Sequence, residues 1–125
     1  MRENKFRAWD KIHDKYREPM VYDILNEKIV VRFPIETLKK GEFLLEQYTG
    51  LKDKNGKEIY EGDIISFENE KGLARVLWLD RKAMFGLKWL DCGVEDELDY
   101  WNVCRGPAEV IGNSHEYPEL LENEK

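Results

Sequence analysis

The sequence predicts a mainly β protein. Hydrophobic and polar residues alternate over short stretches, as in KFRAW at residues 5–9, and this period of two is typical of strands. Turn dipeptides such as Asn55-Gly56 separate these stretches. The sustained 3.6-residue period of a helix-rich fold is absent. These features predict a small, bent SH3-like barrel in the C-terminal two-thirds, with an N-terminal β-hairpin region and one or two short helices.

The N-terminal third is predicted to form strands and one short helix. After KFRAW, the segment MVYDILNEKIVVRF at residues 20–33 predicts a hairpin around Asn26-Glu27. PIETLKKG at residues 34–41 predicts a helix of about two turns, because Pro34 suits a first turn and Gly41 suits a C-terminal cap. EFLLEQYTG at residues 42–50 predicts a further strand.

The stretch QYTGLKDKNGKEIYEGDII at residues 47–65 combines apolar residues with three bends. The dipeptide Asn55-Gly56 predicts a type I′ hairpin turn, in which both central residues have positive φ. We interpret the stretch as scaffold that turns the chain into the barrel. The residues predicted to form its bends are Gly50, Asn55, Gly56, Gly62 and Asp63.

The C-terminal part is predicted to continue with strands. LARVLWL at residues 73–79 and MFGLKWL at 84–90 flank a turn at residues 80–82, and AEVIGN at 108–113 is the last strand. VEDELDYWNV at 94–103 fits a strand or a short helix, and EYPELLE at 116–122 predicts a short helix. The 125 residues suit one domain, with residues 1–45 as a β-hairpin extension and 46–125 as the barrel-like core and C-terminal helix.

The charge distribution limits the classes of partner. Residues 1–40 hold 10 Lys or Arg and 7 Asp or Glu, whereas residues 41–125 hold 10 and 19. The acidic majority of the chain repels phosphate backbones, so broad nucleic-acid binding is disfavoured. With two cysteines and no apolar run of about 18 residues, we expect a cytoplasmic protein with reduced thiols and no membrane contact.

Sequence motifs for catalysis or for metal and cofactor binding are absent. In DKNGKEIYEGD, at residues 53–63, Lys57 takes an EF-hand ligand position and Gly56 comes before the position where the EF-hand loop needs its glycine. Cys92, Cys104 and His115 lack the short ligand spacing of structural zinc sites. Neither phosphate-binding glycine motif occurs. We therefore predict a protein that is not an enzyme and that has no metal and no cofactor.

Two groups of residues are candidates for binding. The first is basic with one interleaved tryptophan, and it is a candidate nucleic-acid contact made of Lys5, Arg7, Trp9 and Lys11. An ordinary solvated edge strand and loop is the favoured explanation of this pattern. Tryptophans such as Trp78 and Trp89 on the predicted barrel either stack bases or fill the core.

The second group is acidic and is a candidate contact for a basic partner protein. It consists of Glu95, Asp96, Glu97 and Asp99. Such a run also suits a phosphate mimic, a solvated face, or a sheet edge whose charges prevent self-pairing.

Three blocks of the sequence resemble the YopX family. They are KFRAWD at residues 5–10, the stretch at residues 47–65, and EVIGNSHEYPELLE at residues 109–122. The family consists of small proteins encoded by phages and prophages, so the resemblance implies a phage origin, a cytoplasmic location, a β-rich fold and self-association. The family has no assigned activity, and the resemblance therefore transfers no functional residue.

The leading hypothesis is a non-enzymatic phage accessory protein that binds a host or phage protein, acting as a small homo-oligomer. The alternative is a nucleic-acid-binding module that uses the basic N-terminal segment and exposed aromatic residues. The third and least favoured hypothesis is a metal-dependent hydrolase that uses scattered carboxylates such as Asp63.

Overall fold

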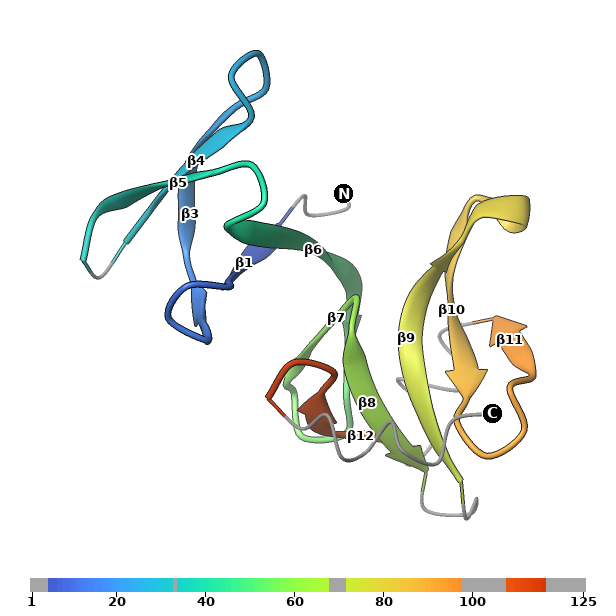
Figure 1. Ribbon diagram of the computed structural model, residues 1–125. Helices are drawn as coiled ribbons and strands as arrows, with labels where there is room; N and C mark the ends of the chain where they lie inside the picture. Colours follow the sequence, from blue (N-terminus) through green and yellow to red (C-terminus); the bar gives the residue numbers. More distant parts are fainter. Residues whose placement is uncertain (1–4, 33, 68–71, 98–107, 117–125) are drawn as a thin grey trace. The chain divides into compact units, whose positions relative to one another are not determined.

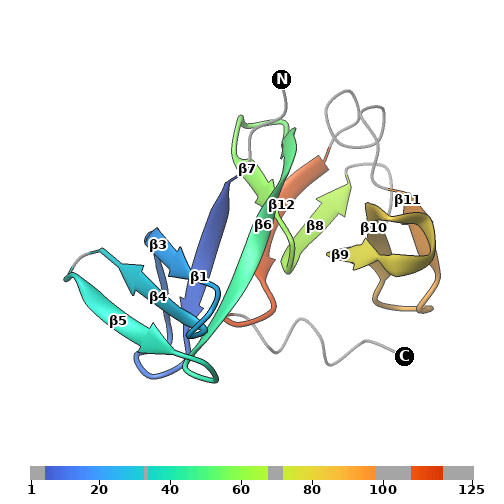
Figure 2. The same cartoon turned by 90° about the horizontal axis from the view of Figure 1, so that it is seen from above.

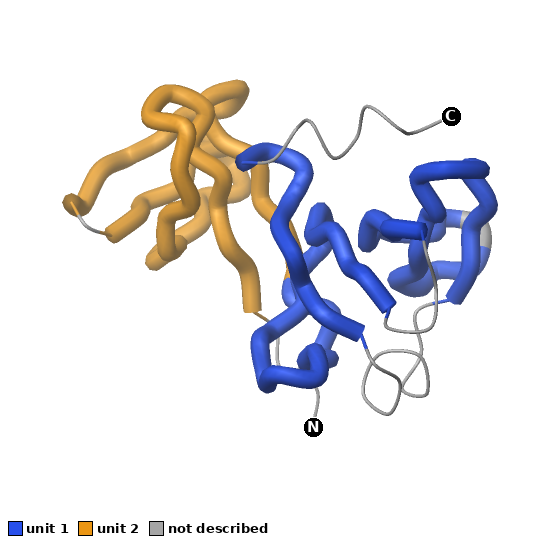
Figure 3. Tube along the Cα trace, turned by 90° about the horizontal axis from the view of Figure 1, so that it is seen from below, with its two compact units in different colours: residues 1–2, 48–125 blue, residues 3–47 orange. Residues whose placement is uncertain are grey.

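The computed structural model describes residues 5–32, 34–67, 72–97 and 108–116. The chain divides into two compact units, shown in Figure 3: unit 2 comprises residues 3–47, and unit 1 comprises residues 1–2 and 48–125. Every regular element of the described residues is a strand, apart from one short 3₁₀ turn (Figure 1). The prediction of a mainly β protein is confirmed. No helix in these ranges is long and apolar enough to cross a membrane.

Unit 2 contains two sets of antiparallel strands. The strand β1 (Phe6–Asp10) pairs with β2 (Lys15–Arg17) and with the first half of β6 (Phe43–Lys52). The other set is the sheet β3-β4-β5, seen side by side in Figure 2, with bounds Pro19–Asp23, Lys28–Val31 and Glu36–Lys39. The buried core of the unit consists of Ala8, Ile29, Val31 and Leu38, against which Phe43 and Leu45 pack.

The hairpin predicted in residues 20–33 is confirmed, whereas the helix predicted in residues 34–41 is wrong. Residues 36–39 form β5, in which Leu38 lies opposite Ile29 of β4. A helix of two turns is marginal in water. The strand instead satisfies its backbone on β4 and buries Leu38, which is 2% exposed. Gly41, with φ of +88°, occupies the turn between β5 and β6.

Unit 1 is built on a five-stranded antiparallel sheet in the order β11-β10-β9-β8-β12. Its strands in chain order are β8 (Asp63–Phe67), β9 (Leu73–Leu79), β10 (Met84–Trp89), β11 (Glu95–Glu97) and β12 (Ala108–Asn113). The second half of β6 pairs with β7 (Glu58–Tyr60). The sheet is curled into a half-barrel. In the described residues its edge strands β11 and β12 do not pair with each other, and a closed SH3-like barrel stays a prediction.

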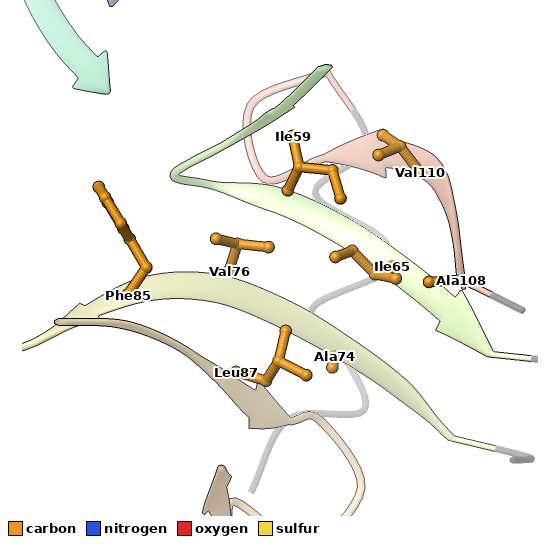
Figure 4. Packing of buried hydrophobic residues seen from close by; sticks show 8 residues of the cluster. All are labelled: Ile59, Ile65, Ala74, Val76, Phe85, Leu87, Ala108 and Val110. Carbon is orange, nitrogen blue, oxygen red and sulfur yellow. The ribbon is translucent and has the colours of Figure 1, made fainter. Parts of the chain in front are cut away.

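The core of unit 1 fills the concave side of this sheet. Strand alternation places Ala74 and Val76 of β9 inward, as the period-two pattern predicts. Figure 4 shows them with the rest of the cluster, which comprises Ile59, Ile65, Phe85, Leu87, Ala108 and Val110. The 3₁₀ turn η1 (Asp80–Lys82) and Ala83, with φ of 50°, join β9 to β10, where the sequence predicted a turn.

The hairpin at Asn55-Gly56 is present, but its turn is not the predicted type I′ turn. Gly56 has φ of +82°, whereas Asn55 is not among the residues with positive φ. The amide of Gly56 donates to the carbonyl of Asp53 at 3.0 Å, and the amide of Asp53 donates to the carbonyl of Lys57 at 2.8 Å. This is a three-residue loop in which a glycine in the left-handed region closes the turn.

The remaining predicted segments are placed in part. Residues 95–97 of the segment 94–103 form the strand β11, and residues 98–103 lie outside the described ranges, as does most of the helix predicted for residues 116–122. The chain passes from unit 2 to unit 1 within β6, between residues 47 and 48. The organisation as a single domain stays a prediction.

We predict that Gly62→Val destabilises the protein more than Lys57→Ala. Gly62 has φ of +92°, its amide donates to Val76 and its carbonyl accepts from Ser114. A β-branched residue resists positive φ, at a cost of about 1–3 kcal/mol. The exposed side chain of Lys57 should contribute less than about 0.5 kcal/mol. Thermal unfolding of both variants tests this, and equal melting temperatures would contradict it.

Candidate protein-binding site

The carboxylate of Asp53 connects the central hairpin to the last strand. It is 6% exposed and accepts hydrogen bonds from the amides of Asn55 at 2.8 Å, Lys57 at 2.9 Å and Val110 of β12 at 2.9 Å. Burial alone would raise the pKa of Asp53, but these backbone hydrogen bonds and the nearby Lys57 lower it overall. Asp53 is thus a structural residue of the turn.

Asp63 has a similar role in the next turn. Its side chain is buried and accepts a hydrogen bond from the amide of Tyr60 at 2.8 Å. Among the described residues there is no group of three His, Cys, Asp or Glu side chains able to hold a metal ion. Cys92 is an exposed thiol, and Cys104 lies outside the described ranges.

Asp10 is the centre of a buried polar cluster at the end of β1. Its carboxylate is fully buried and accepts from the amides of Ile12 at 2.9 Å and His13 at 3.0 Å. It also contacts His13 Nδ1 at 2.7 Å and Arg17 Nη1 at 3.0 Å. Burial alone would raise the pKa of Asp10, but the hydrogen bonds from His13, Ile12 and Arg17 lower it to about 2.

The guanidinium of Arg17 extends this cluster to the chain between β4 and β5. It donates to the carbonyl of Arg32 at 3.1 Å and to the carbonyl of Pro34, and it lies 3.5 Å from the carboxylate of Glu36. An arginine that donates to two backbone carbonyls fixes a loop. All of these partners lie within unit 2, so we assign the Asp10–Arg17 cluster to the stability of unit 2.

The basic candidate residues lie on or beside β1, and two of them are engaged within unit 2. Arg7 Nε donates to Glu46 at 2.8 Å, and its guanidinium lies 4.1 Å from the centre of the Tyr16 ring. Trp9 is only 7% exposed and packs edge-on against Tyr16. Lys5 and Lys11 are exposed. Residues 3–47 contain nine Lys or Arg and nine Asp or Glu, so unit 2 has no excess of positive charge.

The acidic candidate residues form the edge strand β11 of unit 1. Glu95, Asp96 and Glu97 are all exposed, and they lie opposite residues 86–88 of β10. Asp96 accepts a hydrogen bond from Trp89 Nε1 at 2.9 Å, and Glu97 forms an ion pair with Lys82 at 3.1 Å. Asp99, the fourth residue of the predicted patch, lies outside the described ranges.

A recess of about 270 Å³ adjoins this acidic strand, and the sequence did not predict it. It is lined by Trp78, Leu79, Asp80, Lys82 and Glu95. The side chain of Trp78 is 40% exposed, and its ring packs edge-on against Phe85 at a centroid distance of 5.0 Å. The partly exposed indole and two carboxylates thus meet in one place, together with Lys82, whose charge is paired with Glu97. We call this arrangement the Trp78 recess.

The chemistry of the Trp78 recess suits a cationic side chain. An indole face attracts an ammonium or guanidinium group, and carboxylates beside it add to that attraction. Because residues 3–47 are balanced in charge, the net charge of -6 arises entirely from unit 1. The sequence does not reveal this site. Ala74, Val76 and Trp78 occupy alternate positions of the same strand, which predicts that all three point inward, but of these three only Trp78 is exposed.

The chain belongs to the YopX family. The model of this family, described as YopX protein, matches residues 5–122. It is also similar to the crystal structure of protein EF1440 from Enterococcus faecalis, with 30% sequence identity and a TM-score of 0.71. That likeness covers 98% of this chain and 100% of the other. No curated protein is significantly similar to the chain. The family predicted from the three sequence blocks is confirmed, and these likenesses assign no activity.

We predict that Asp10 makes stability dependent on pH in the acid range. A carboxyl with a folded-state pKa of about 2, below its ordinary 3.8, contributes fully above pH 4 and loses this contribution as pH falls toward 2. At about 1.4 kcal/mol per pKa unit, the contribution is about 2 kcal/mol. Asp10→Asn should therefore be less stable at pH 7 and lose less stability between pH 5 and 2.

Urea unfolding at several pH values measures this effect. The matched control is Asp14→Asn, because Asp14 is exposed and asparagine tolerates its φ of 53°. The control should keep the pH dependence of the unaltered chain. A pH dependence in Asp10→Asn equal to that of the control would contradict the assignment.

Proposed function

We propose that this YopX-family protein is a non-enzymatic phage or prophage accessory protein that binds a basic segment of a host or phage protein in the bacterial cytoplasm. The observation that supports this proposal is the Trp78 recess, in which a 40% exposed indole lies beside Asp80, Glu95 and the acidic strand β11. The family likeness supports the proposed phage origin and location.

Energetic magnitudes indicate the size of the partner segment. A cation–π contact at an exposed site contributes about 0.5–1 kcal/mol, and an exposed ion pair contributes at most about 1 kcal/mol. A micromolar complex requires about 8 kcal/mol, so one lysine or arginine is insufficient. The row of carboxylates along β11 offers further contacts for a segment with several basic residues. We expect binding that weakens steeply as salt increases.

We propose no catalytic activity, because three buried carboxylates already accept hydrogen bonds from the backbone. Asp10, Asp53 and Asp63 each accept hydrogen bonds from turn amides. A carboxylate held in this way has fewer lone pairs available for a metal ion or a reacting proton. This argument disfavours the hydrolase hypothesis, which required scattered carboxylates such as Asp63.

The nucleic-acid alternative has less support than a protein partner. Its two most distinctive residues, Arg7 and Trp9, contact Glu46 and Tyr16 within unit 2. The more exposed Trp78 lies among carboxylates, which repel phosphates. Oligonucleotide binding is therefore an outcome that the experiment below must include.

We predict that the full chain binds a peptide of alternating arginine and threonine residues at low salt, and that Trp78→Ala weakens this binding about 2- to 5-fold. The substitution leaves the charge of the protein unchanged, so a loss isolates the contribution of the indole face. Glu95→Gln should also weaken binding. Isothermal titration calorimetry with the peptide, and with single-stranded and duplex oligonucleotides, measures these affinities.

The matched control is Glu27→Gln, because Glu27 is an exposed carboxylate of unit 2 outside the recess. It should bind the peptide as the unaltered chain does. Absence of peptide binding at low salt, or equal affinity in Trp78→Ala, would overturn the proposal. Tighter binding of an oligonucleotide than of the peptide would favour the nucleic-acid alternative.

A further inference from the structure

Unit 2 contains a groove of about 450 Å³ that opens beside the strand β3. Ile29, which is fully buried, and the partly buried Leu45 belong to the core of the unit and also line this groove. The groove also contacts Phe6 on β1 and residues 18–22, and Lys5 lies at its border. Its lining is predominantly apolar, which is the character of a binding groove and not of an ordinary solvated surface.

The strand β3 itself is an unusual edge strand. In the described part of the chain it pairs with β4 alone, and β1 lies nearby without pairing with it. Its residues 19–22 carry no charge, and Met20, Val21 and Tyr22 are 39%, 59% and 47% exposed. Natural edge strands usually carry a charge, a proline or a bulge, or are covered, because an apolar edge pairs with other chains. Pro19 and a register shift between Pro19 and Val21 protect the start of β3, whereas residues 20–22 leave the rest of the edge apolar.

The turn that follows β3 holds this edge in a defined position. The carboxylate of Asp23 accepts hydrogen bonds from the amide of Asn26 at 3.2 Å and from its side-chain nitrogen at 2.8 Å. Tyr22 packs edge-on against Phe43 at a centroid distance of 6.3 Å. Because these contacts fix the end of the strand, its outer side is organised before any partner binds.

An extended peptide fits this groove and the adjacent strand edge better than a compact ligand does. A strand edge offers backbone donors and acceptors at strand spacing, and an added strand pairs with them while every second side chain enters the groove. The apolar lining selects uncharged side chains for the centre of such a peptide.

Charges at the ends of β3 select the ends of the peptide. Glu18 precedes the uncharged residues and Asp23 follows them. The side chain of Glu18 is 65% exposed and forms a long ion pair with Arg32, at 3.8 Å. A second copy is disfavoured, because the antiparallel register that aligns residues 19–22 with themselves places Glu18 opposite Asp23.

We propose that the edge of β3 and its groove bind an extended segment of a partner protein by strand addition. The segment has about four uncharged, β-forming residues in its centre and a lysine or arginine at each end. This site lies wholly within unit 2 and is independent of the Trp78 recess in unit 1.

The test uses the full chain and a capped peptide of sequence Lys-Thr-Val-Tyr-Val-Lys, with a glutamate-ended peptide of the same centre as its counterpart. Fluorescence anisotropy of labelled peptides gives the affinities. We expect the lysine-ended peptide to bind at least 10-fold more tightly than the glutamate-ended peptide. Val21→Lys should weaken the binding of the lysine-ended peptide at least 10-fold, because it places a charge on the strand edge.

The matched control is Leu25→Lys, since Leu25 is 94% exposed in the same hairpin and does not line the groove. Leu25→Lys should change the affinity for the lysine-ended peptide less than 2-fold, and Trp78→Ala should leave that affinity unchanged. Thermal unfolding establishes that both lysine variants fold. Failure of the lysine-ended peptide to bind, or equal losses in Val21→Lys and Leu25→Lys, would overturn the proposal.

Sedimentation equilibrium of the same proteins tests the other occupant. We expect Val21→Lys and the unaltered chain to have the same oligomeric state. A dimer that Val21→Lys converts to a monomer would show that a second copy occupies the edge of β3, and it would overturn the assignment to a basic-ended partner segment.

Discussion

The structure of unit 1 depends on the carboxylate of Asp53. Three backbone amides donate to it, two from its own hairpin loop and one from Val110, which is 57 residues away in the sequence. Hydrogen bonds to a charged group contribute about 1.5–3 kcal/mol, more than those between neutral groups. One side chain thereby sets the shape of a turn and attaches the last strand to it.

Carboxylates also accept hydrogen bonds from turn amides in unit 2, where the described residues likewise form only strands and turns. Such a fold has many turn amides without a partner in a sheet, and buried amides need a hydrogen-bond acceptor. Asp10 supplies one at the end of β1, and Asp23 supplies another at the tip of the β3–β4 hairpin. The abundance of acidic residues in this chain is therefore partly structural, whereas the exposed carboxylates of β11 lie at the surface.

The small size of unit 2 explains why it exposes apolar residues. In its described residues, the cluster of buried hydrophobic side chains comprises four residues together with two partly buried neighbours. So small a core cannot cover every apolar side chain of three sheet strands. Tyr22 and Met20 thus remain at the surface beside a groove that reaches the core residue Ile29.

Much of the fold could be predicted from the sequence, because hairpins are specified by neighbouring residues. The alternation in residues 73–79 and the turn after it predicted β9, η1 and β10. The helix at residues 34–41 was predicted wrongly, because the end signals of Pro34 and Gly41 are local, whereas β5 forms through pairing with β4. Local propensity yields to such long-range pairing.

The candidate sites could be predicted only in part. The acidic strand could be predicted from its run of charged residues. The exposure of Trp78 could not, because it depends on where the curled sheet ends, which no residue pattern predicts. Similarly, the turn at Asn55 differs from the predicted type because the Asp53 side chain, through its bonds to Asn55 and Lys57, takes part in the loop. The β3 groove depends on residues from four strands, and sequence neighbours do not reveal it.

The most direct test of the role of Asp53 is hydrogen exchange of the Val110 amide in Asp53→Ala, followed by NMR. Our account predicts that exchange at Val110 becomes at least 10-fold faster, and that exchange at Ile29 in unit 2 is unchanged. Asp23→Ala is the control, because it removes a turn carboxylate of unit 2, and it should leave Val110 as protected as in the unaltered chain. Full protection of the Val110 amide in Asp53→Ala would contradict the claim that this carboxylate attaches the last strand to the central hairpin.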